Sequence, residues 1–425
     1  MTMRRVAAMI LAGGRADSLL ALSRVRAKAS VPFGGQYRLI DFPLSNCTHS
    51  GLTDVGILTQ YLPESLKTHV GIGKPWDLDR RDGGVRLLEP YYTGGESQWY
   101  RGRADALAQN LEVLDDEGFD EVLVLAAEHV YKMDYRPLLD FHASSGAGVT
   151  VVGKDLPVAH ARRYGVIKTG RGHAVASYGE EPPAEGTAFA SLSIYVFSRP
   201  FLLTLLRDMI RRGGSAIAED LVVPAIEQNA AAAYRLDDYW ARIDTVEEYY
   251  DVTFQFLAEE PPFAFDDPAW PLYTHLHDDP PVKLGPGADV KNSIVADGSI
   301  VNGRVENSVL FRRVYVERDA VVTNSILLEG TTAEAGASVD RAVLDKLVRV
   351  GAGARVGEDI GEARPNADFP EQLSRGLTLV GKRVRIPPGF RLGRNCLLDL
   401  GVGESDLAAL PDRTLANGTS AGVSA

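Results

Sequence analysis

The stretch VAAMILAGG, residues 6–14, places six apolar residues directly before Ala12 and paired glycines. The apolar run is too short to span a membrane and is typical of a buried strand that ends in a tight turn. Glycines at that point let the backbone approach a phosphate, because no Cβ stands in the way. We therefore expect a nucleotide to bind here, although a strand-to-helix turn alone would need the same glycines. The expected binding residues are Leu11, Ala12, Gly13 and Gly14.

Outward from this strand, short apolar runs alternate with a segment whose apolar residues recur at helical spacing. The alternation predicts βαβ units, and so a mostly parallel sheet covered by helices in a Rossmann-like α/β domain over residues 1–255. Ligands on such sheets bind beyond the carboxyl ends of the strands. The expected strands are residues 55–58, 121–127 and 149–152, and the expected helix is residues 104–114.

The second half of the chain has a different texture. Prolines cluster in residues 256–285, which we expect to form a linker, and from residue 286 Val, Ile or Leu returns every five or six positions. Such a short repeat is typical of a hexapeptide β-helix, whose coils point small apolar side chains into a shared core. Strands of a β-sandwich, the alternative, are longer and alternate strictly. We expect the β-helix over residues 286–400, with a loop at 358–375 and a tail over 401–425.

Composition narrows the function. The chain has 425 residues, a formal net charge of −12 and two cysteines, Cys47 and Cys396. The negative charge argues against nucleic-acid binding, and any anionic ligand must be drawn in by local cations. Two distant cysteines make neither a disulfide framework nor a zinc pattern. With no segment apolar and long enough to span a bilayer, we expect a cytoplasmic protein without membrane or nucleic-acid partners.

Six segments carry more specific information. They are RAKASVPFGGQYRLIDFPLSNC at residues 26–47, WYRGRADAL at 99–107, HVYKMDY at 129–135, ASLSIYVF at 190–197, DPAWPLYT at 267–274 and LDK at 344–346. In collinear order, over about residues 6–360, the chain resembles the ADP-glucose pyrophosphorylase (glucose-1-phosphate adenylyltransferase) family. The resemblance implies a nucleotidyltransferase domain followed by a left-handed parallel β-helix.

The resemblance also implies a reaction. Family members join ATP and glucose 1-phosphate into ADP-glucose and pyrophosphate for glycogen or starch synthesis, using basic residues and Mg²⁺ held by two aspartates. Matched positions here are a catalytic lysine, further nucleotide-binding residues, sugar-phosphate-binding residues and two arginines near the site for phosphorylated sugar effectors. The catalytic lysine is Lys28, and the further nucleotide-binding residues are Tyr100, Gly102 and Asp105. The sugar-phosphate-binding residues are Ser191 and Tyr195, and the arginines near the effector site are Arg26 and Arg38.

Four matched positions depart from the family pattern. Ser18 replaces the arginine of the glycine loop, Glu128 lengthens the first metal aspartate, Glu181 replaces the sugar-phosphate lysine, and Arg242 replaces the second metal aspartate. Together these changes exchange attraction for repulsion at a site that must gather phosphates, and they leave Glu128 as the only matched acidic ligand for Mg²⁺. Each altered cation matters, since losing one phosphate-clamping cation costs about 10³ to 10⁵ in rate in related transfer enzymes.

Two further details bear on these positions. In the same loop, Ala16 stands where the family has a flexible glycine, and Arg15 is a candidate substitute for the lost arginine. A shifted register in the segment YWARIDT, residues 239–245, would make Asp244 the metal ligand instead of Arg242. In the unshifted register, we expect Arg242 to form an ion pair with Glu128.

Three functions stay open at this point. The first is a regulatory subunit with an altered site, which joins a catalytic paralogue in a tetramer. The second is an active enzyme with a rearranged site, in which Glu128, Asp244 and Lys28 hold metal and phosphates. The third is a sensor that binds ATP, ADP-glucose or a sugar phosphate and acts through protein contacts. The preserved frame with altered charges favours the first.

Overall fold

The computed structural model describes residues 4–14, 17–90, 92–93, 96–97, 99–116 and 118–422. These residues form two compact units, each assembled from separate stretches of the chain. The first unit contains residues 4–14, Ile40–Trp240 and Pro268–Tyr273, and the second contains residues 17–39, Ala241–Asp267 and 274–422. The domain boundaries expected from the sequence, after residues 255, 285 and 400, stay a prediction.

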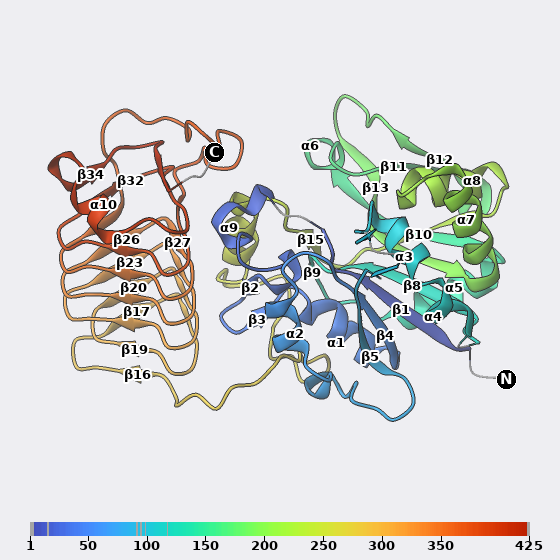
Figure 1. Cartoon of the computed structure of the whole chain (residues 1–425), viewed down its shortest axis with the longest axis horizontal. Coiled ribbons are helices and arrows are strands. Elements are labelled where there is room, and N and C mark those ends of the chain that lie inside the picture. The colour runs from blue at the N-terminus through green and yellow to red at the C-terminus, as the bar shows by residue number, and fades with distance from the viewer. Residues whose placement is uncertain are drawn as a thin grey trace. The chain divides into compact units, whose positions relative to one another are not determined.

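A nine-stranded sheet is the frame of the first unit. The strand β1 (Val6–Leu11) is buried throughout and pairs in parallel with β4 (Asp54–Leu58) and β8 (Glu121–Ala126), while β4 pairs in parallel with β5 (Gly84–Leu88). The strands expected at 6–11, 55–58 and 121–127 are therefore confirmed, and the α/β fold with them. Figure 1 shows β1 within this sheet.

The rest of the sheet is mixed. On the other side of β8, β13 (Thr187–Ser198) runs antiparallel, and it pairs antiparallel with β10 (Val149–Pro157) and β11 (Val166–Thr169). The parallel arrangement expected from the sequence thus holds for the four strands around β1. The remaining strands of the sheet are β12 (Val175–Glu180), antiparallel to β11, and β14 (Ala231–Arg235), parallel to β10.

Helices cover the sheet. Of these, α3 (Arg103–Gln109), α4 (Leu111–Asp116) and α7 (Arg199–Arg212) share one apolar core with β1, β8 and β13 (Figure 1). The single helix expected over residues 104–114 is divided at Asn110, which is a correction. The Asn110 amide donates to the carbonyl of Ala106 (2.9 Å) and to the Tyr100 hydroxyl (3.1 Å), and this competition with backbone bonding ends α3.

The other regular elements of this unit connect the strands. They are α1 (Asp41–His49), α2 (Glu64–Val70), β6 (Tyr92–Thr93), β7 (Glu96–Ser97), β9 (His129–Tyr131), α5 (Tyr135–Ser145), α6 (Val158–Ala161) and α8 (Val223–Glu227). Part of the expected linker packs here, because the Trp270 indole donates to Asn46 (3.2 Å) and lies against the His49 ring.

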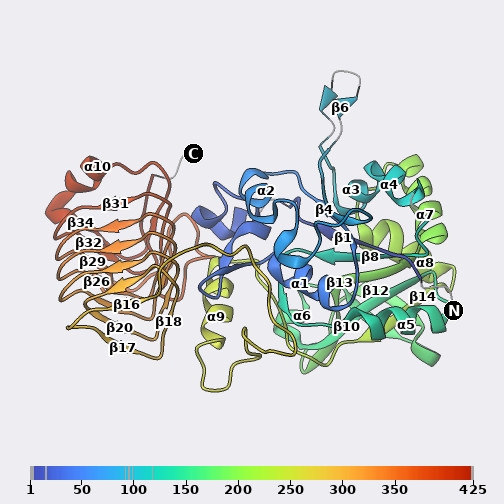
Figure 2. The same cartoon turned by 90° about the horizontal axis from the view of Figure 1, so that it is seen from below.

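A left-handed parallel β-helix dominates the second unit, and the β-sandwich alternative is wrong. Every strand pairs in parallel with the strand one coil later, so three sheets run along the stack (Figures 1 and 2). Inward-facing Val, Leu and Ala side chains, such as Val301, Val322 and Leu344, form its continuous core. Small β-branched residues suit these two- or three-residue strands because each coil side has room for one inward side chain.

The strand bounds are as follows. The first sheet contains β16 (Lys283–Leu284), β19 (Ile300–Val301), β22 (Tyr315–Val316), β25 (Thr332–Ala333), β28 (Arg349–Val350) and β31 (Arg385–Ile386). The second contains β17 (Asp289–Lys291), β20 (Arg304–Glu306), β23 (Val321–Thr323), β26 (Ser338–Asp340), β29 (Arg355–Glu358), β32 (Arg391–Gly393) and β34 (Thr414–Leu415). The third contains β18 (Ile294–Val295), β21 (Val309–Leu310), β24 (Ile326–Leu327), β27 (Ala342–Leu344), β30 (Thr378–Val380), β33 (Leu397–Leu398) and β35 (Ser420–Ala421).

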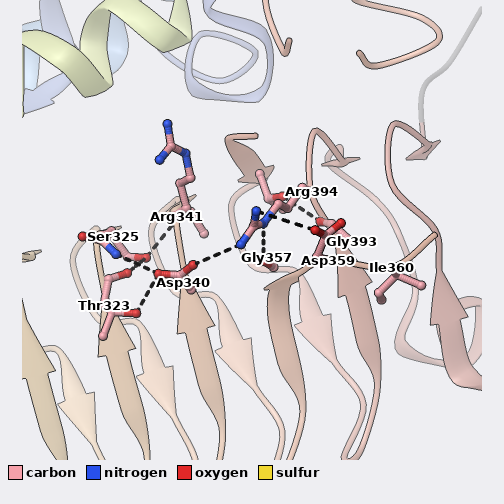
Figure 3. Close-up of polar contacts among 12 residues, drawn as sticks. Thr323, Ser325, Asp340, Arg341, Gly357, Asp359, Ile360, Gly393 and Arg394 are labelled. Atoms are coloured by element: carbon pink, nitrogen blue, oxygen red, sulfur yellow. Dashed lines mark hydrogen bonds and ion pairs between the residues drawn. The ribbon is translucent and has the colours of Figure 1, made fainter. Parts of the chain in front are cut away.

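Asparagine recurs at one corner of the β-helix, and the backbone conformation there explains why. Asn292, Asn307 and Asn324 all have left-handed backbones, which Asn tolerates well, and their amides bond in a ladder (3.1 and 2.7 Å). The ladder ends where Asn324 donates to Asp340 (2.9 Å). In the next coil the corner residue is Arg341, and its side chain points away from the coils (Figure 3).

At that corner the repeat opens into an excursion, which we define as residues 359–377, and the interruption expected at 358–375 is confirmed. The excursion is held to the coils by two asparagines. Asn366 donates to the Asn395 carbonyl (2.8 Å), and Asn417 donates to Asp359 (3.0 Å). Arg394 lies between Asp359 and Asp340, as Figure 3 shows. The expected tail contributes β34, β35 and the short helix α10 (Glu404–Ala408).

The remaining parts of the second unit lie outside the β-helix. They are two short 3₁₀ helices at Asp17–Leu22 and Lys28–Ser30, the hairpin β2 (Pro32–Phe33) and β3 (Tyr37–Arg38), the end of β15 (Trp240–Arg242), and α9 (Val246–Gln255). Tyr250 of α9 donates its hydroxyl proton to the carbonyl of Asn324 (2.7 Å), so α9 is bound to the corner ladder. Over the described ranges, every helix is too short or too polar to cross a bilayer.

Candidate functional site

The glycine turn and Glu128 lie where expected, at the carboxyl ends of strands in the first unit's sheet. Leu11 ends β1, Ala12 donates its N–H to the carbonyl of Leu58 (2.8 Å), and Ala127 donates to the carbonyl of Leu11 (3.2 Å). Glu128 follows in the turn after β8. Because these strands are parallel neighbours, the turn and Glu128 meet at their carboxyl ends, where ligands bind in such folds. Arg15 and Ala16 lie outside the described residues.

Gln60 also lies at the carboxyl ends of these strands, and the sequence did not single it out. A Cβ on Gly13 would stand 3.4 Å from the Gln60 Cβ, so the glycine keeps this approach open, whereas Gly14 has no atom that close. Gln60 also accepts from the Tyr100 N–H and donates to the Tyr100 carbonyl (3.4 Å). Its position just after β4 is the signal that could have identified it.

Gly102 and Asp105 shape the start of α3. A Cβ on Gly102 would lie 2.4 Å from the Ser215 carbonyl oxygen, so only glycine fits beside that backbone. The buried Asp105 carboxylate accepts from the N–H of Arg101 (2.9 Å) and from the Gln109 amide (3.0 Å). These contacts account for both residues structurally, and their nucleotide-binding role stays a prediction.

Glu128 has a cationic partner in its own unit. Arg103 Nη2 lies 2.7 Å from Glu128 Oε1, and the Glu128 side chain is 9% exposed. A buried carboxylate needs such a partner, because desolvation penalises an isolated charge. The sequence did not single out Arg103, although it lies within the WYRGRADAL segment. The expected Glu128–Arg242 ion pair stays a prediction.

The predicted sugar-phosphate residues lie on β13. Ser191 and Tyr195 are both buried. Burial raises the pKa of the Tyr178 hydroxyl far above its usual range. Glu181, which is exposed, directly follows β12 at the end of the sheet where Val166 pairs with residues 180 and 190. The structure therefore places the residue after the end of β12, the negatively charged Glu181, near the part of β13 that contains Ser191.

In the second unit, four residues form what we call the Asp244 cluster: Ser18, Lys28, Arg242 and Asp244. Lys28 Nζ lies 2.7 Å and Arg242 Nε 3.0 Å from the same oxygen, Asp244 Oδ1. The Ser18 hydroxyl donates to the Asp244 carbonyl. The side chain of Lys28 is 13% exposed, that of Arg242 is 19% exposed and that of Asp244 is 20% exposed. The sequence placed Lys28 and Arg242 at the site, and Asp244 is the residue that joins them.

These residues do not fit a magnesium ion. Within the ranges that the structure describes, no three His, Cys, Asp or Glu side chains are grouped to hold a metal. Glu128 is paired with Arg103, and Asp244 already meets two cations. Mg²⁺ requires near-octahedral oxygen ligands, and a guanidinium at position 242 repels it. We therefore derive no step through a metal.

Arg26, expected near an effector site, is a buried brace in this structure. Its guanidinium donates to both oxygens of Asp345 (2.9 and 3.0 Å) and to the Leu22 carbonyl (3.0 Å). The two side chains are 3% and 0% exposed. This bidentate geometry stabilises both charges away from water. A role for Arg26 in effector binding stays a prediction.

Around this brace lies a group of cations that we call the Lys346 corner: Arg38, Lys346, Lys382 and Arg383. Burial lowers the pKa of Lys346, because the lysine's bond to Glu329 (2.7 Å) does not fully offset desolvation and nearby Arg38. Burial, followed by Arg26 and Arg383, lowers the pKa of Lys382. In the described part of the chain, Lys382 and Arg383 have no carboxylate within ion-pair distance. The corner therefore has excess positive charge, which suits an anion.

Comparison with known proteins covers nearly the whole chain. A nucleotidyl transferase family model matches residues 7–259, and a GlmU-like, C-terminal hexapeptide model matches residues 283–380. The chain is 42% identical over 412 residues to a glucose-1-phosphate adenylyltransferase of Thermomicrobium roseum, covering 95% of both chains. It is 38% identical over 408 residues to that of Thermotoga neapolitana (95% of this chain, 96% of the relative), and 36% identical over 399 residues to that of Acetivibrio thermocellus (93% of both).

Proposed function

The chain belongs to the glucose-1-phosphate adenylyltransferase family, and we propose that it is a regulatory subunit that assembles with a catalytic relative in a tetramer for ADP-glucose synthesis. One observation carries the proposal: charges that would serve the reaction are bonded to one another. Lys28 and Arg242 both meet Asp244, and Glu128 meets Arg103.

The chemistry supports this reading of the site. Nucleotidyl transfer relies on positioning and on neutralising phosphate charge, with little covalent work by the protein. Ser18 supplies no charge, Glu181 supplies the wrong sign, and Arg242 cannot ligate a metal. Each such change is worth several orders of magnitude in rate, so we expect turnover by the chain alone to be negligible.

The Lys346 corner supports the regulatory half of the proposal. It retains lysines whose pKa values are lowered by burial and by neighbouring cations, which is the arrangement that gains most from a bound anion. We propose that a phosphorylated sugar binds there, with Arg38 close by and Arg26 holding the corner through Asp345. The cations that we expect to bind an effector are thus present in the chain, while the charges that we expect to serve the reaction are paired with one another.

Two assays test the proposal. The purified chain alone should give no Mg²⁺-dependent exchange of pyrophosphate into ATP, and adding it to a catalytic relative should change that relative's response to fructose bisphosphate. The matched control is Lys346→Gln, which should still assemble but lose the changed response. Robust exchange by the chain alone, or co-purification that fails with every family paralogue, would overturn the proposal.

A second candidate rests on Asp244. A carboxylate beside Lys28 is what an active enzyme with a rearranged site would need, with Glu128 as the other acid. If this is the function, Glu128→Ala should abolish a measurable wild-type turnover, and Arg103→Gln, which removes only its partner, should not. An unchanged rate in Glu128→Ala would exclude it.

Calorimetry addresses the third candidate, a sensor. ATP, ADP-glucose and fructose bisphosphate are titrated separately into the isolated chain. Binding without turnover and without assembly with a catalytic paralogue would indicate a sensor that acts through other proteins. Heat from fructose bisphosphate alone, together with assembly, agrees with the regulatory subunit.

A further inference from the structure

One oxygen atom is the focus of the Asp244 cluster. Asp244 Oδ1 is the shared acceptor of the Lys28 ammonium (2.7 Å) and the Arg242 guanidinium (3.0 Å). Lys28 lies 216 residues before Asp244 in the sequence, whereas Arg242 lies only two residues before it. A guanidinium and an ammonium that converge on one anionic oxygen form the arrangement with which proteins hold phosphate oxygens.

The backbone that carries Asp244 is fixed on its helical side. Thr245 caps α9, and the Glu248 carboxylate accepts from the N–H groups of Asp244 (2.9 Å) and Thr245 (3.1 Å). This reciprocal capping box orders the residues before the helix. The short Asp244 side chain is therefore presented to the two cations by an ordered main chain.

The same helical turn is also anchored to the excursion of the β-helix. Glu247 is buried and accepts from the N–H groups of Ser374 (2.7 Å) and Arg375 (2.8 Å), while its other oxygen meets Arg375 Nε (2.7 Å). Bonds on both sides of the turn hold the Asp244 backbone, and only its side chain can move without breaking them.

We propose that Lys28 and Arg242 form a metal-independent binding site for the phosphate oxygens of pyrophosphate or a nucleotide, and that the Asp244 carboxylate keeps this site occupied in the free protein. The inference deepens the proposed function, on which it rests, by naming the ligand class of the altered site. The carboxylate oxygen stands in for a phosphate oxygen, and a ligand must displace it to bind.

The charges explain why no metal is required. Both cations already lie at Asp244 Oδ1 in the free protein, so a phosphate oxygen that replaces this carboxylate oxygen meets two donors that are already in place. Arg242 supplies the planar donor that suits a phosphate, and Lys28 supplies a point charge. Partial exposure of all three side chains leaves the group within reach of a solute, unlike the Arg26–Asp345 brace.

The test measures binding without chemistry. Sodium pyrophosphate is titrated calorimetrically into the full-length chain in EDTA. Asp244→Asn removes the competing charge and should tighten binding by roughly 10- to 100-fold, the worth of a charge-assisted hydrogen bond or two. The matched control is Asp251→Asn, on the helix that follows Asp244 and paired with Arg375, which changes the net charge equally and should leave the affinity within about 2-fold.

Further variants define the donors. Adding Arg242→Gln to Asp244→Asn should return the affinity to the wild-type value or below. If Asp244→Asn does not fold, wild type is compared with Arg242→Gln at millimolar pyrophosphate in EDTA, and the variant should bind more weakly. Equal affinity of wild type and Asp244→Asn, or of wild type and Arg242→Gln, would overturn the inference and leave the cluster as a structural brace.

The two proposals fail in different ways. Turnover by the isolated chain overturns the regulatory subunit but does not alter the pyrophosphate titration in EDTA. An affinity that does not respond to Asp244→Asn overturns the binding site and leaves the regulatory subunit standing. An affinity that rises only when Mg²⁺ replaces EDTA also counts against the inference, because it shows that the protein cations do not suffice.

Discussion

The Asp244 cluster and the Lys346 corner lie in the same unit and use the same residue types, yet their charges are arranged in opposite ways. In the cluster, one aspartate oxygen accepts from both a lysine and an arginine. In the corner, Lys346 has Glu329 as its partner, whereas among the described residues Lys382 and Arg383 have no carboxylate within ion-pair distance, and burial and neighbouring cations lower the pKa values of both lysines. The same residue types can therefore be paired with one another in one part of a unit and carry excess positive charge in another.

The largest expected effect is on the free energy of unfolding, through the Arg26–Asp345 brace beside the Lys346 corner. Asp345→Ala leaves the Arg26 guanidinium buried without its carboxylate, and we expect a loss of about 3–5 kcal/mol in the free energy of unfolding. Chemical denaturation followed by tyrosine and tryptophan fluorescence measures it. The control is Asp289→Ala, whose exposed pair with Lys291 should be worth about 0.5 kcal/mol. Equal effects of the two substitutions would contradict the distinction between a buried brace and a surface pair.

The second effect concerns ligand affinity at the corner. Lys346→Gln removes a partly buried ammonium and should weaken binding of fructose bisphosphate roughly 10- to 100-fold, as expected for one charge-assisted contact. Calorimetry on the full-length chain measures the affinity. Lys291→Gln removes an exposed lysine from β17 and serves as the control, with no more than about a 2-fold change. If both variants weaken binding alike, only the net charge matters and the corner is not the site.

A third, smaller effect is the pH dependence of that affinity. The pKa values of Lys346 and Lys382 lie below 10.5 in the free protein, and a bound anion favours the protonated lysines. Binding should therefore take up protons at alkaline pH, and affinity should fall as pH rises through the lowered pKa values, by up to about 10-fold per pH unit and coupled proton. Titrations between pH 7 and pH 10 test the sign. If the affinity does not change with pH in either the wild type or Lys346→Gln, neither lysine contacts the anion.

The smallest effect is on the stability of the Asp244 cluster. Arg242→Gln removes a partly exposed cation whose carboxylate keeps Lys28 as a partner, so the free energy of unfolding should fall by only about 1 kcal/mol or less. The denaturation experiment used for Asp345→Ala gives the comparison. A loss as large as that of the brace would mean that the cluster is mainly structural, and it would weaken the case for a ligand there.

Local patterns predicted the elements of this chain well. The run at residues 6–11 and the five- to six-residue repeat are periodic signals that need no distant partner, and both gave the observed strands. The helix expected over residues 104–114 failed at Asn110 because a side chain bonds across the turn to Tyr100, a contact that apolar spacing does not encode.

The sequence named residues of the candidate site but not the ion pairs that they form. Motif comparison identified Lys28, Glu128 and Arg242, whereas their partners Asp244 and Arg103 became clear only from the geometry. Arg26 was expected near an effector and proved to be bonded to a residue 319 positions away. Ion pairs between distant segments depend on the finished fold, so a single sequence carries no periodic signal for them.

That separation of 319 residues has a consequence for how the chain is made. At a synthesis rate of about 5–20 residues per second, Asp345 leaves the ribosome roughly 15–60 s after Arg26. During this interval the Arg26 guanidinium has no carboxylate to receive it, although other residues of the same segment can already meet earlier partners, as Lys28 does with Asp244. A premature stop before Asp345 would leave the Arg26 guanidinium without the carboxylate that offsets its burial.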